Sequence, residues 1–108
     1  MASDDLTIEE ARQELIRLLD GGDYQIAGKA EAEGRRILKQ SMEHPTQWAI
    51  VAFALDLLQS NFPLHAVPQG DPPGSRGIGY EMRNADGRGL YIKLKLEDDQ
   101  AWLISFHY

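Results

Sequence analysis

The C-terminal third of the chain alternates between apolar and polar residues, and this alternation constrains the fold more than any other feature. Apolar residues occupy every second position from Ile78 to Met82, from Leu90 to Leu96 and from Trp102 to Phe106. A period of two is typical of half-buried strands. Turn signals, Asp86-Gly87 and Asp98-Asp99, separate the three runs. The pattern therefore predicts three antiparallel strands joined as a β-meander.

Parity decides which side chains share a face of this meander, because a slip of one residue in the pairing moves every side chain to the opposite face. Pairing Met82 with Ile92, and Ile92 with Phe106, keeps the apolar positions together. Connections of odd length give this pairing, so we expect the loops Asp86-Gly87-Arg88 and Asp98-Asp99-Gln100. The face that packs on the helices should then hold Ile78, Tyr80, Met82, Leu90, Ile92, Leu94, Leu96, Ile104 and Phe106.

The opposite face of the meander is expected to collect residues with chemical function. One row across the three strands consists of Arg83, Tyr91 and His107. The next row consists of Glu81, Lys93 and Ser105. Histidine, tyrosine and glutamate side chains can transfer protons, and basic side chains can stabilise charge on a phosphate. The same residue types also suit the solvated side of an antiparallel sheet, which is the structural alternative.

The N-terminal part of the chain predicts three helices, over 8–20, about 24–42 and about 46–60. The first begins with a capping box, in which Thr7 and Glu10 stand three residues apart before an apolar helical repeat. The third is apolar on nearly every side, which is typical of a central packed helix. Helices followed by strands favour an α+β fold.

Residues 61–77 contain four prolines and three glycines, so we expect an irregular loop there, either a plain connector or a binding loop. The expected fold is therefore α+β, with three N-terminal helices packed on one face of a three-stranded antiparallel β-meander. The 108 residues are enough for one domain, spanning 1–108, and too few for two independent cores.

Composition limits the classes of function. The net charge is −6, and the whole acidic excess falls in residues 1–75, whereas residues 76–108 carry five basic and five acidic side chains. A nucleic-acid role would therefore need a local cationic patch in the C-terminal third. The N-terminus has no basic segment followed by an apolar stretch, and no apolar run is long enough to span a bilayer. These features favour a cytoplasmic protein without membrane contact.

No metal or cofactor is expected. The chain has no cysteine, and His44, His65 and His107 lack the spacing of metal ligands. The scattered glycines of residues 70–79 match neither the phosphate-binding loop nor the dinucleotide-binding fingerprint.

Two segments of the C-terminal third together resemble a known toxin family. Gly89-Leu90-Tyr91-Ile92-Lys93-Leu94, followed by Leu103-Ile104-Ser105-Phe106-His107, resembles the C-terminal hairpin of RelE-like toxins, especially the MqsR (motility quorum-sensing regulator) branch. The resemblance implies a small α+β endoribonuclease that cleaves mRNA without metal and is held inactive by an antitoxin. It also implies roles for Tyr91 and Lys93, which match family positions, and for His107, which stands where the family often has a lysine.

One hypothesis is therefore a metal-independent endoribonuclease that acts on mRNA, free or on the ribosome, with a cognate antitoxin as its protein partner. Glu81 or His107 would act as general base, and His107 or Tyr91 as general acid. Four basic side chains would bind the RNA phosphates, namely Arg83, Lys93, Lys95 and, from the proline-rich loop, Arg76.

The alternative hypothesis is a protein of the same shape that has no enzymatic activity. An immunity, antitoxin-like or regulatory module would bind a protein partner through the acidic helices or through the proline-rich loop. The sequence leaves open whether the chain is an enzyme.

Overall fold

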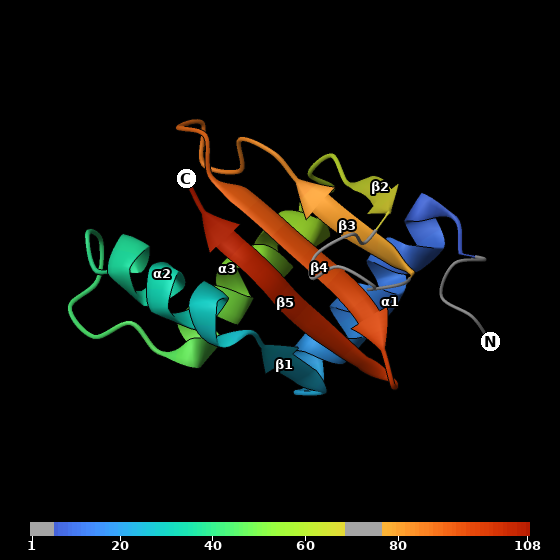
Figure 1. Cartoon of the computed structure of the whole chain (residues 1–108), viewed down its shortest axis with the longest axis horizontal. Helices are drawn as coiled ribbons and strands as arrows, with labels where there is room; N and C mark the ends of the chain where they lie inside the picture. Colours follow the sequence, from blue (N-terminus) through green and yellow to red (C-terminus); the bar gives the residue numbers. More distant parts are fainter. Residues whose placement is uncertain (1–5, 69–76) are drawn as a thin grey trace.

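A computed structural model of the chain describes residues 6–68 and 77–108. Within these residues the fold is α+β, with three helices and a five-stranded mixed sheet (Figure 1). The elements, in chain order, are α1 (Ile8–Asp20), β1 (Tyr24–Ile26), α2 (Gly28–Leu38), α3 (Gln47–Gln59), β2 (His65–Pro68), β3 (Ile78–Met82), β4 (Tyr91–Glu97) and β5 (Gln100–His107).

The predicted three-stranded meander is wrong, although its three strands are present as β3, β4 and β5. The strand order is β1-β5-β4-β3-β2, and each end of the meander carries one further strand. Strand β1 pairs with β5 in parallel, and β2 pairs with β3 in antiparallel orientation. Because β1 stands between α1 and α2, the helices do not form one N-terminal block.

The first helix begins and ends as its sequence predicts. The Thr7 side chain accepts a hydrogen bond from the Glu10 amide, and the Glu10 carboxylate accepts one from the Thr7 amide, which confirms the capping box. Helix α1 ends at Asp20, where Gly21 donates its amide hydrogen to the carbonyl of Arg17.

The predicted helix over 24–42 is wrong at both ends. Residues Tyr24–Ile26 form β1, and the Ala27 amide continues the pairing by donating to the carbonyl of Leu103. Helix α2 then begins at Gly28, so this glycine stands at the helix start and costs little there. Three residues are too few for a period of two to emerge from the sequence, and the pairing with β5 decides their conformation.

Helix α2 packs closely on α3 through Gly34. A Cβ atom built on Gly34 would lie 2.8 Å from Cδ1 of Ile50, and Ile50 is fully buried. The predicted third helix is confirmed as α3, whose N-cap Thr46 accepts a hydrogen bond from the Ala49 amide. Trp48, in its first turn, is nevertheless 47% exposed and lies beside the ring of Tyr24.

Part of the predicted loop over 61–77 is also a strand. Residues His65–Pro68 form β2, with His65 opposite Glu81 and Pro68 opposite Ile78. Proline is tolerated because β2 is an edge strand, where one side of the backbone needs no partner. Residues 69–76, including Arg76, lie outside the described residues.

The predicted register of the central strands is confirmed: Met82 pairs with Ile92, and Ile92 pairs with Phe106. The second turn differs from the prediction, because Glu97 pairs with Gln100 across a two-residue turn.

Both residues of this turn have positive φ, 53° at Asp98 and 58° at Asp99, as a tight hairpin turn requires. A β-bulge at Ile104 then adds the odd residue, since Lys93 pairs with Ser105 whereas Leu94 pairs with Leu103.

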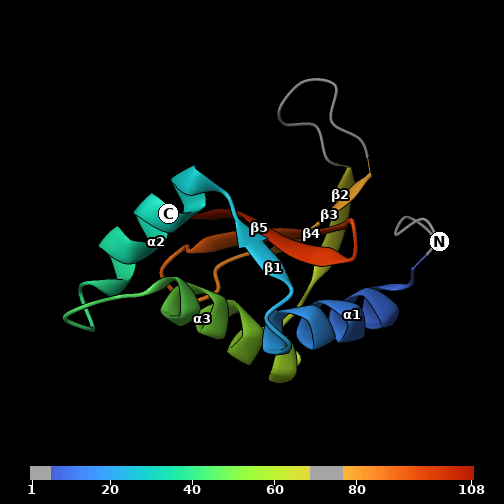
Figure 2. The same ribbon diagram turned by 90° about the horizontal axis from the view of Figure 1, so that it is seen from below.

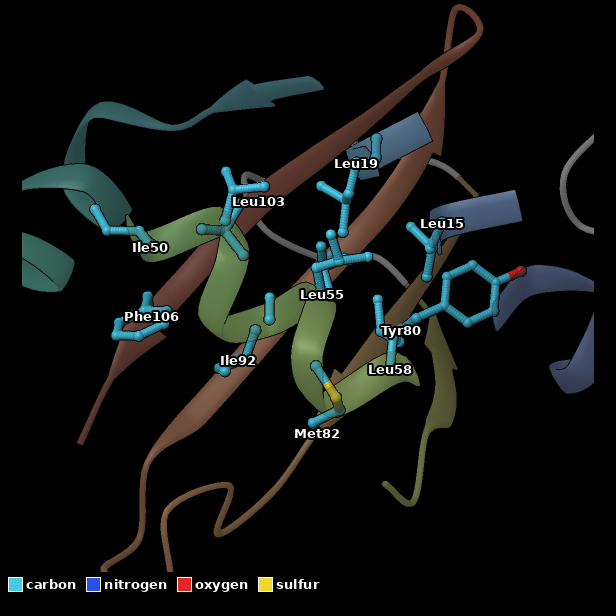
Figure 3. Close-up of a cluster of buried hydrophobic side chains, with 14 of the residues drawn as sticks. Leu15, Leu19, Ile50, Leu55, Leu58, Tyr80, Met82, Ile92, Leu103 and Phe106 are labelled. Atoms are coloured by element: carbon cyan, nitrogen blue, oxygen red, sulfur yellow. The ribbon is translucent and has the colours of Figure 1, made fainter. Parts of the chain in front are cut away.

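Among the described elements, helices cover one face of the sheet, and none covers the other. Helices α1 and α3 lie against the same face, and α2 flanks the sheet beside β5, so only two of the three helices occupy the predicted position (Figure 2). The core lies between α1, α3 and the sheet (Figure 3), and its large side chains include Leu15, Leu19, Ile50, Leu55, Leu58, Tyr80, Met82, Ile92, Leu103 and Phe106. Among the described helices, none has the length and apolar character needed to cross a membrane.

Candidate functional site

The sheet face turned away from α1 and α3, here called the outer face, carries the polar rows that the sequence predicts. Figure 1 looks onto this face. Tyr91 pairs with His107, and Arg83 directly follows Met82, the last residue of β3 that pairs with β4. The next row runs across four strands and consists of His65, Glu81, Lys93 and Ser105. The predicted site residues of the meander therefore share one face.

Glu81 is the most deeply buried charged residue on this face, at 4% exposure. Its Oε2 accepts a hydrogen bond of 2.8 Å from the hydroxyl of Tyr91. Its Oε1 makes no hydrogen bond of good geometry, but it forms an ion pair with Nη2 of Arg83. Because both carboxylate oxygens are engaged and shielded from solvent, the geometry favours Glu81 as the group that positions Tyr91 and Arg83.

Tyr91 is held as a neutral hydrogen-bond donor. Burial and the hydrogen bond to Glu81, together with the negative charge of Glu81, raise the pKa of Tyr91 to about 12, and the charge of Arg83 offsets a part of this rise. A phenol with this pKa keeps its proton at neutral pH. Since its proton is directed at Glu81, Tyr91 suits the role of positioning group better than that of general acid.

His107 is the exposed proton-transfer group of the row. Its ring lies 5.4 Å from the ring of Tyr91, centroid to centroid, with the planes tilted by 42°. Its Nδ1 lies 2.9 Å from the backbone oxygen of Tyr108. In the tautomer that carries the proton on Nδ1, this nitrogen donates to Tyr108 and leaves Nε2 to accept a proton. An exposed imidazole held in this way can accept a proton at Nε2 as a general base.

Asp86 holds the residue that follows His107. Its Oδ1 accepts hydrogen bonds from the amides of Arg88, at 2.8 Å, and Leu90, at 3.1 Å, while Oδ2 accepts one from the Tyr108 hydroxyl. Burial raises the pKa of Asp86, but these hydrogen bonds outweigh it and hold the pKa below its usual value. The β3–β4 connection thereby fixes Tyr108, and through its backbone oxygen the ring of His107.

The predicted phosphate-binding residues differ in how freely they could bind a ligand. The Arg83 side chain is 70% exposed although it pairs with Glu81. Lys93 is partly exposed, between Glu81 and Ser105. Lys95 is less available, because its side chain is 17% exposed and its Nζ lies 2.8 Å from Oε2 of Glu97. Arg76 falls outside the described residues.

Two residues of the outer face were missed by sequence reasoning. Trp102 pairs with Lys95 and therefore lies on the outer face, because the bulge at Ile104 reverses the parity of the first half of β5. His65 lies opposite Glu81. A two-residue hairpin signal at Asp98-Asp99 could have placed Trp102, whereas His65 depends on an edge pairing that no local pattern indicates.

Among the described residues, no group of three or more histidine, aspartate or glutamate side chains is arranged to hold a metal ion. The chain matches no protein-family model, and neither a curated protein nor a solved structure gave a significant match. The outer face itself is therefore the basis on which a function can be assigned.

Proposed function

We propose that the outer face binds single-stranded RNA and that His107 catalyses attack of a ribose 2′-hydroxyl on the adjacent phosphate. The observation that supports this proposal is the row across β3, β4 and β5, in which Tyr91 lies between the exposed imidazole of His107 and the exposed guanidinium of Arg83. Aromatic rings on a sheet face also suit stacking by unpaired bases.

The reaction assigns each group a separate task. Nε2 of His107 takes the proton from the 2′-hydroxyl as the bond between O2′ and phosphorus forms. The bond between phosphorus and the 5′-oxygen breaks, the 5′-oxygen takes a proton from water, and the products are a 2′,3′-cyclic phosphate and a 5′-hydroxyl. Arg83 and Lys93 would stabilise the negative charge that develops on the phosphate oxygens.

Glu81 and Tyr91 would support this chemistry without touching the substrate. Glu81 holds the Arg83 guanidinium by an ion pair, and Tyr91 links Glu81 to the ring of His107. Contacts of this kind keep the reacting groups within the narrow geometry that catalysis requires.

The charges of the outer face suit an anionic ligand although the whole chain carries −6. Its described basic side chains, Arg83, Lys93 and Lys95, face two carboxylates, Glu81 and Glu97. Both carboxylates are already paired within the protein, which leaves Lys93 as a cation without a carboxylate partner among the described side chains. A local patch of positive charge is what the binding of a phosphate backbone requires.

Cleavage of a short fluorescent single-stranded RNA tests the proposal. The matched substrate has 2′-deoxyribose at every position, and without the 2′-hydroxyl it should not be cut. His107→Ala should lower kcat by about 10²- to 10⁴-fold, the usual contribution of a positioned general base. Added imidazole should restore part of the activity of His107→Ala but should not change the wild type.

The products and the variants decide the outcome. A 2′,3′-cyclic phosphate on the 5′ fragment supports the proposed reaction. If the wild type binds RNA but does not cleave it, the protein is an RNA-binding protein and not a ribonuclease. If the wild type neither binds nor cleaves RNA, the proposal is overturned and the alternative hypothesis, a protein-binding module, is favoured.

A further inference from the structure

We infer that the RNA path continues from His107 onto the C-terminal half of α2, where Arg36 and Lys39 form a second phosphate-binding subsite. The inference rests on the proposed function and names its substrate class: strands of several nucleotides, bound beyond the phosphate that is cut.

The first observation is the position of α2. The helix flanks the sheet beside β5, and in both Figure 1 and Figure 2 the C-terminal end of the chain lies next to it. Glu33 lies on α2, and its pKa is lowered mainly by the hydrogen bond from Arg36. The charge of His107 also lowers the pKa of Glu33, so this end of the chain is close enough to interact with α2. Helix α2 is therefore the neighbour of the proposed site on this side.

The second observation is the charge of this helix. Residues 28–39 carry four basic side chains and two acidic ones, and three of the basic side chains lie at the C-terminal end: Arg35 and Arg36 in the last turn of α2, and Lys39 at its C-cap. Arg35 and Arg36 pair with Glu31 and Glu33. No described side chain pairs with Lys39.

The third observation is an open hollow at the same end of the helix. It lies between the last turns of α2 and the connection to α3, and it is lined by Arg35, Arg36, Lys39, Glu43, His44 and Pro45. The Arg36 side chain is 62% exposed and keeps guanidinium hydrogens for a ligand besides those given to Glu33. The hollow thus offers cationic donors where a strand leaving His107 along α2 would pass.

Charge is distributed unevenly over the molecule, and this distribution favours binding of a polyanion on the side of α2. Helix α1, on the covered face of the sheet, carries four acidic side chains against two basic ones. A polyanion would be repelled from α1 and attracted toward α2. An RNA strand carries the single sign of charge that such a surface attracts.

Binding of 2′-O-methyl RNA tests the inference separately from cleavage, because this RNA has no attacking hydroxyl. The probes are a 4-mer and a 12-mer of the same base. Lys39→Gln should weaken 12-mer binding several-fold at low salt and leave 4-mer binding unchanged. It should also reduce the slope of log K against log salt concentration by about 0.7, the value for one phosphate contact in a single strand.

Arg17→Gln is the matched control, since it removes one exposed positive charge from α1 on the opposite side of the molecule. This control should alter neither affinity nor salt slope. If Lys39→Gln and Arg17→Gln bind the 12-mer alike, the second subsite is excluded, while cleavage of a 4-mer RNA would still support the proposed function. If the wild type cuts no RNA but binding of the 12-mer depends on Lys39, the ribonuclease is excluded and the RNA path stands.

Discussion

The hydroxyl of Tyr91 donates a 2.8 Å hydrogen bond to a carboxylate oxygen of Glu81, a residue that is 4% exposed on the outer face of the sheet. The bond adds to the effect of burial and raises the pKa of Tyr91 to about 12. Because the folded pKa lies above the ordinary value of 10, the neutral phenol stabilises the fold fully below pH 10. That contribution is lost as the pH rises from 10 through about 12.

Tyr91→Phe should therefore remove a part of the alkaline sensitivity of the protein. In urea unfolding, the wild type should lose more free energy of unfolding between pH 9 and pH 11 than Tyr91→Phe does. When tyrosinate absorbance at 295 nm is followed against pH, Tyr91→Phe should lack the component that titrates near pH 12 in the wild type. Tyr24→Phe serves as control and should keep the wild-type dependence on pH. If the free energy of unfolding depends on pH equally in the wild type and in Tyr91→Phe, this account of Tyr91 is wrong.

We expect substitution by alanine to have opposite effects on the free energy of unfolding at Gly34 and at Gly28, although both residues belong to α2. Alanine in a helix interior is favoured over glycine by about 1 kcal/mol. At Gly34 the added Cβ would lie 2.8 Å from Cδ1 of the buried Ile50, and overpacking costs about 1–3 kcal/mol. Gly34→Ala should therefore lower the free energy of unfolding, whereas Gly28→Ala, with no atom within 4 Å, should leave it equal or raise it.

Urea unfolding of the two glycine variants measures these effects. A second substitution, Ile50→Val, should recover a part of the stability that Gly34→Ala loses, because it removes the Cδ1 atom from the contact. Gly34→Ala as stable as Gly28→Ala would show that α2 and α3 can separate without cost.

Arg12 ties α1 to the end of α3. Its guanidinium is buried and donates to the carbonyl of Leu58, at 3.2 Å, and to that of Phe62, at 2.7 Å. Arg12→Ala leaves these carbonyls without a donor, and each unsatisfied buried group costs about 1–3 kcal/mol. We expect a large drop in the urea midpoint for Arg12→Ala and almost none for Arg17→Ala, whose side chain is 64% exposed.

The hydrogen bond from Tyr108 to Asp86 predicts a change in acid stability. Asp86 has a lowered folded pKa, so its contribution to stability is present above its ordinary pKa and is lost as the pH falls through the folded value. Tyr108→Phe removes one of the hydrogen bonds that lower this pKa. The pKa of Asp86, followed by carboxyl NMR, should rise toward its ordinary value, and acid unfolding should begin at a higher pH. An unchanged Asp86 titration would show that this hydrogen bond does not form in solution.

Sequence patterns predicted the parts of the fold that depend on local chemistry. The capping box of Thr7 and Glu10 gave the start of α1, and the alternation of apolar residues gave β3, β4 and β5. The pairing of Ile92 with Phe106 was predicted correctly for the wrong reason. An even turn and a bulge at Ile104 have the same effect on parity as the odd loop that was expected, but only the bulge places Trp102 on the outer face.

The two outer strands could not be predicted because neighbours, and not local sequence, determine them. Tyr24–Ile26 is extended because the edge of β5 offers hydrogen-bond partners to it. Residues His65–Pro68 contain a proline and pair with only one strand. Of the candidate site, sequence parity placed Tyr91 beside His107, but it could not show that Glu81 is buried and bound by Tyr91.

The parallel pairing of β1 with β5 has a consequence for the order in which the protein can form. Tyr24 is made early in synthesis, and its partner Ala101 is made near the end of these 108 residues. Contacts between segments so distant in sequence form slowly, because a long loop must close first. Until β5 has docked, β1 has no partner and His107 has no neighbour in Tyr91. A nascent chain that stops short of β5 would therefore lack His107 and the strand on which it lies, so the proposed reaction could begin only after β5 has paired with β4.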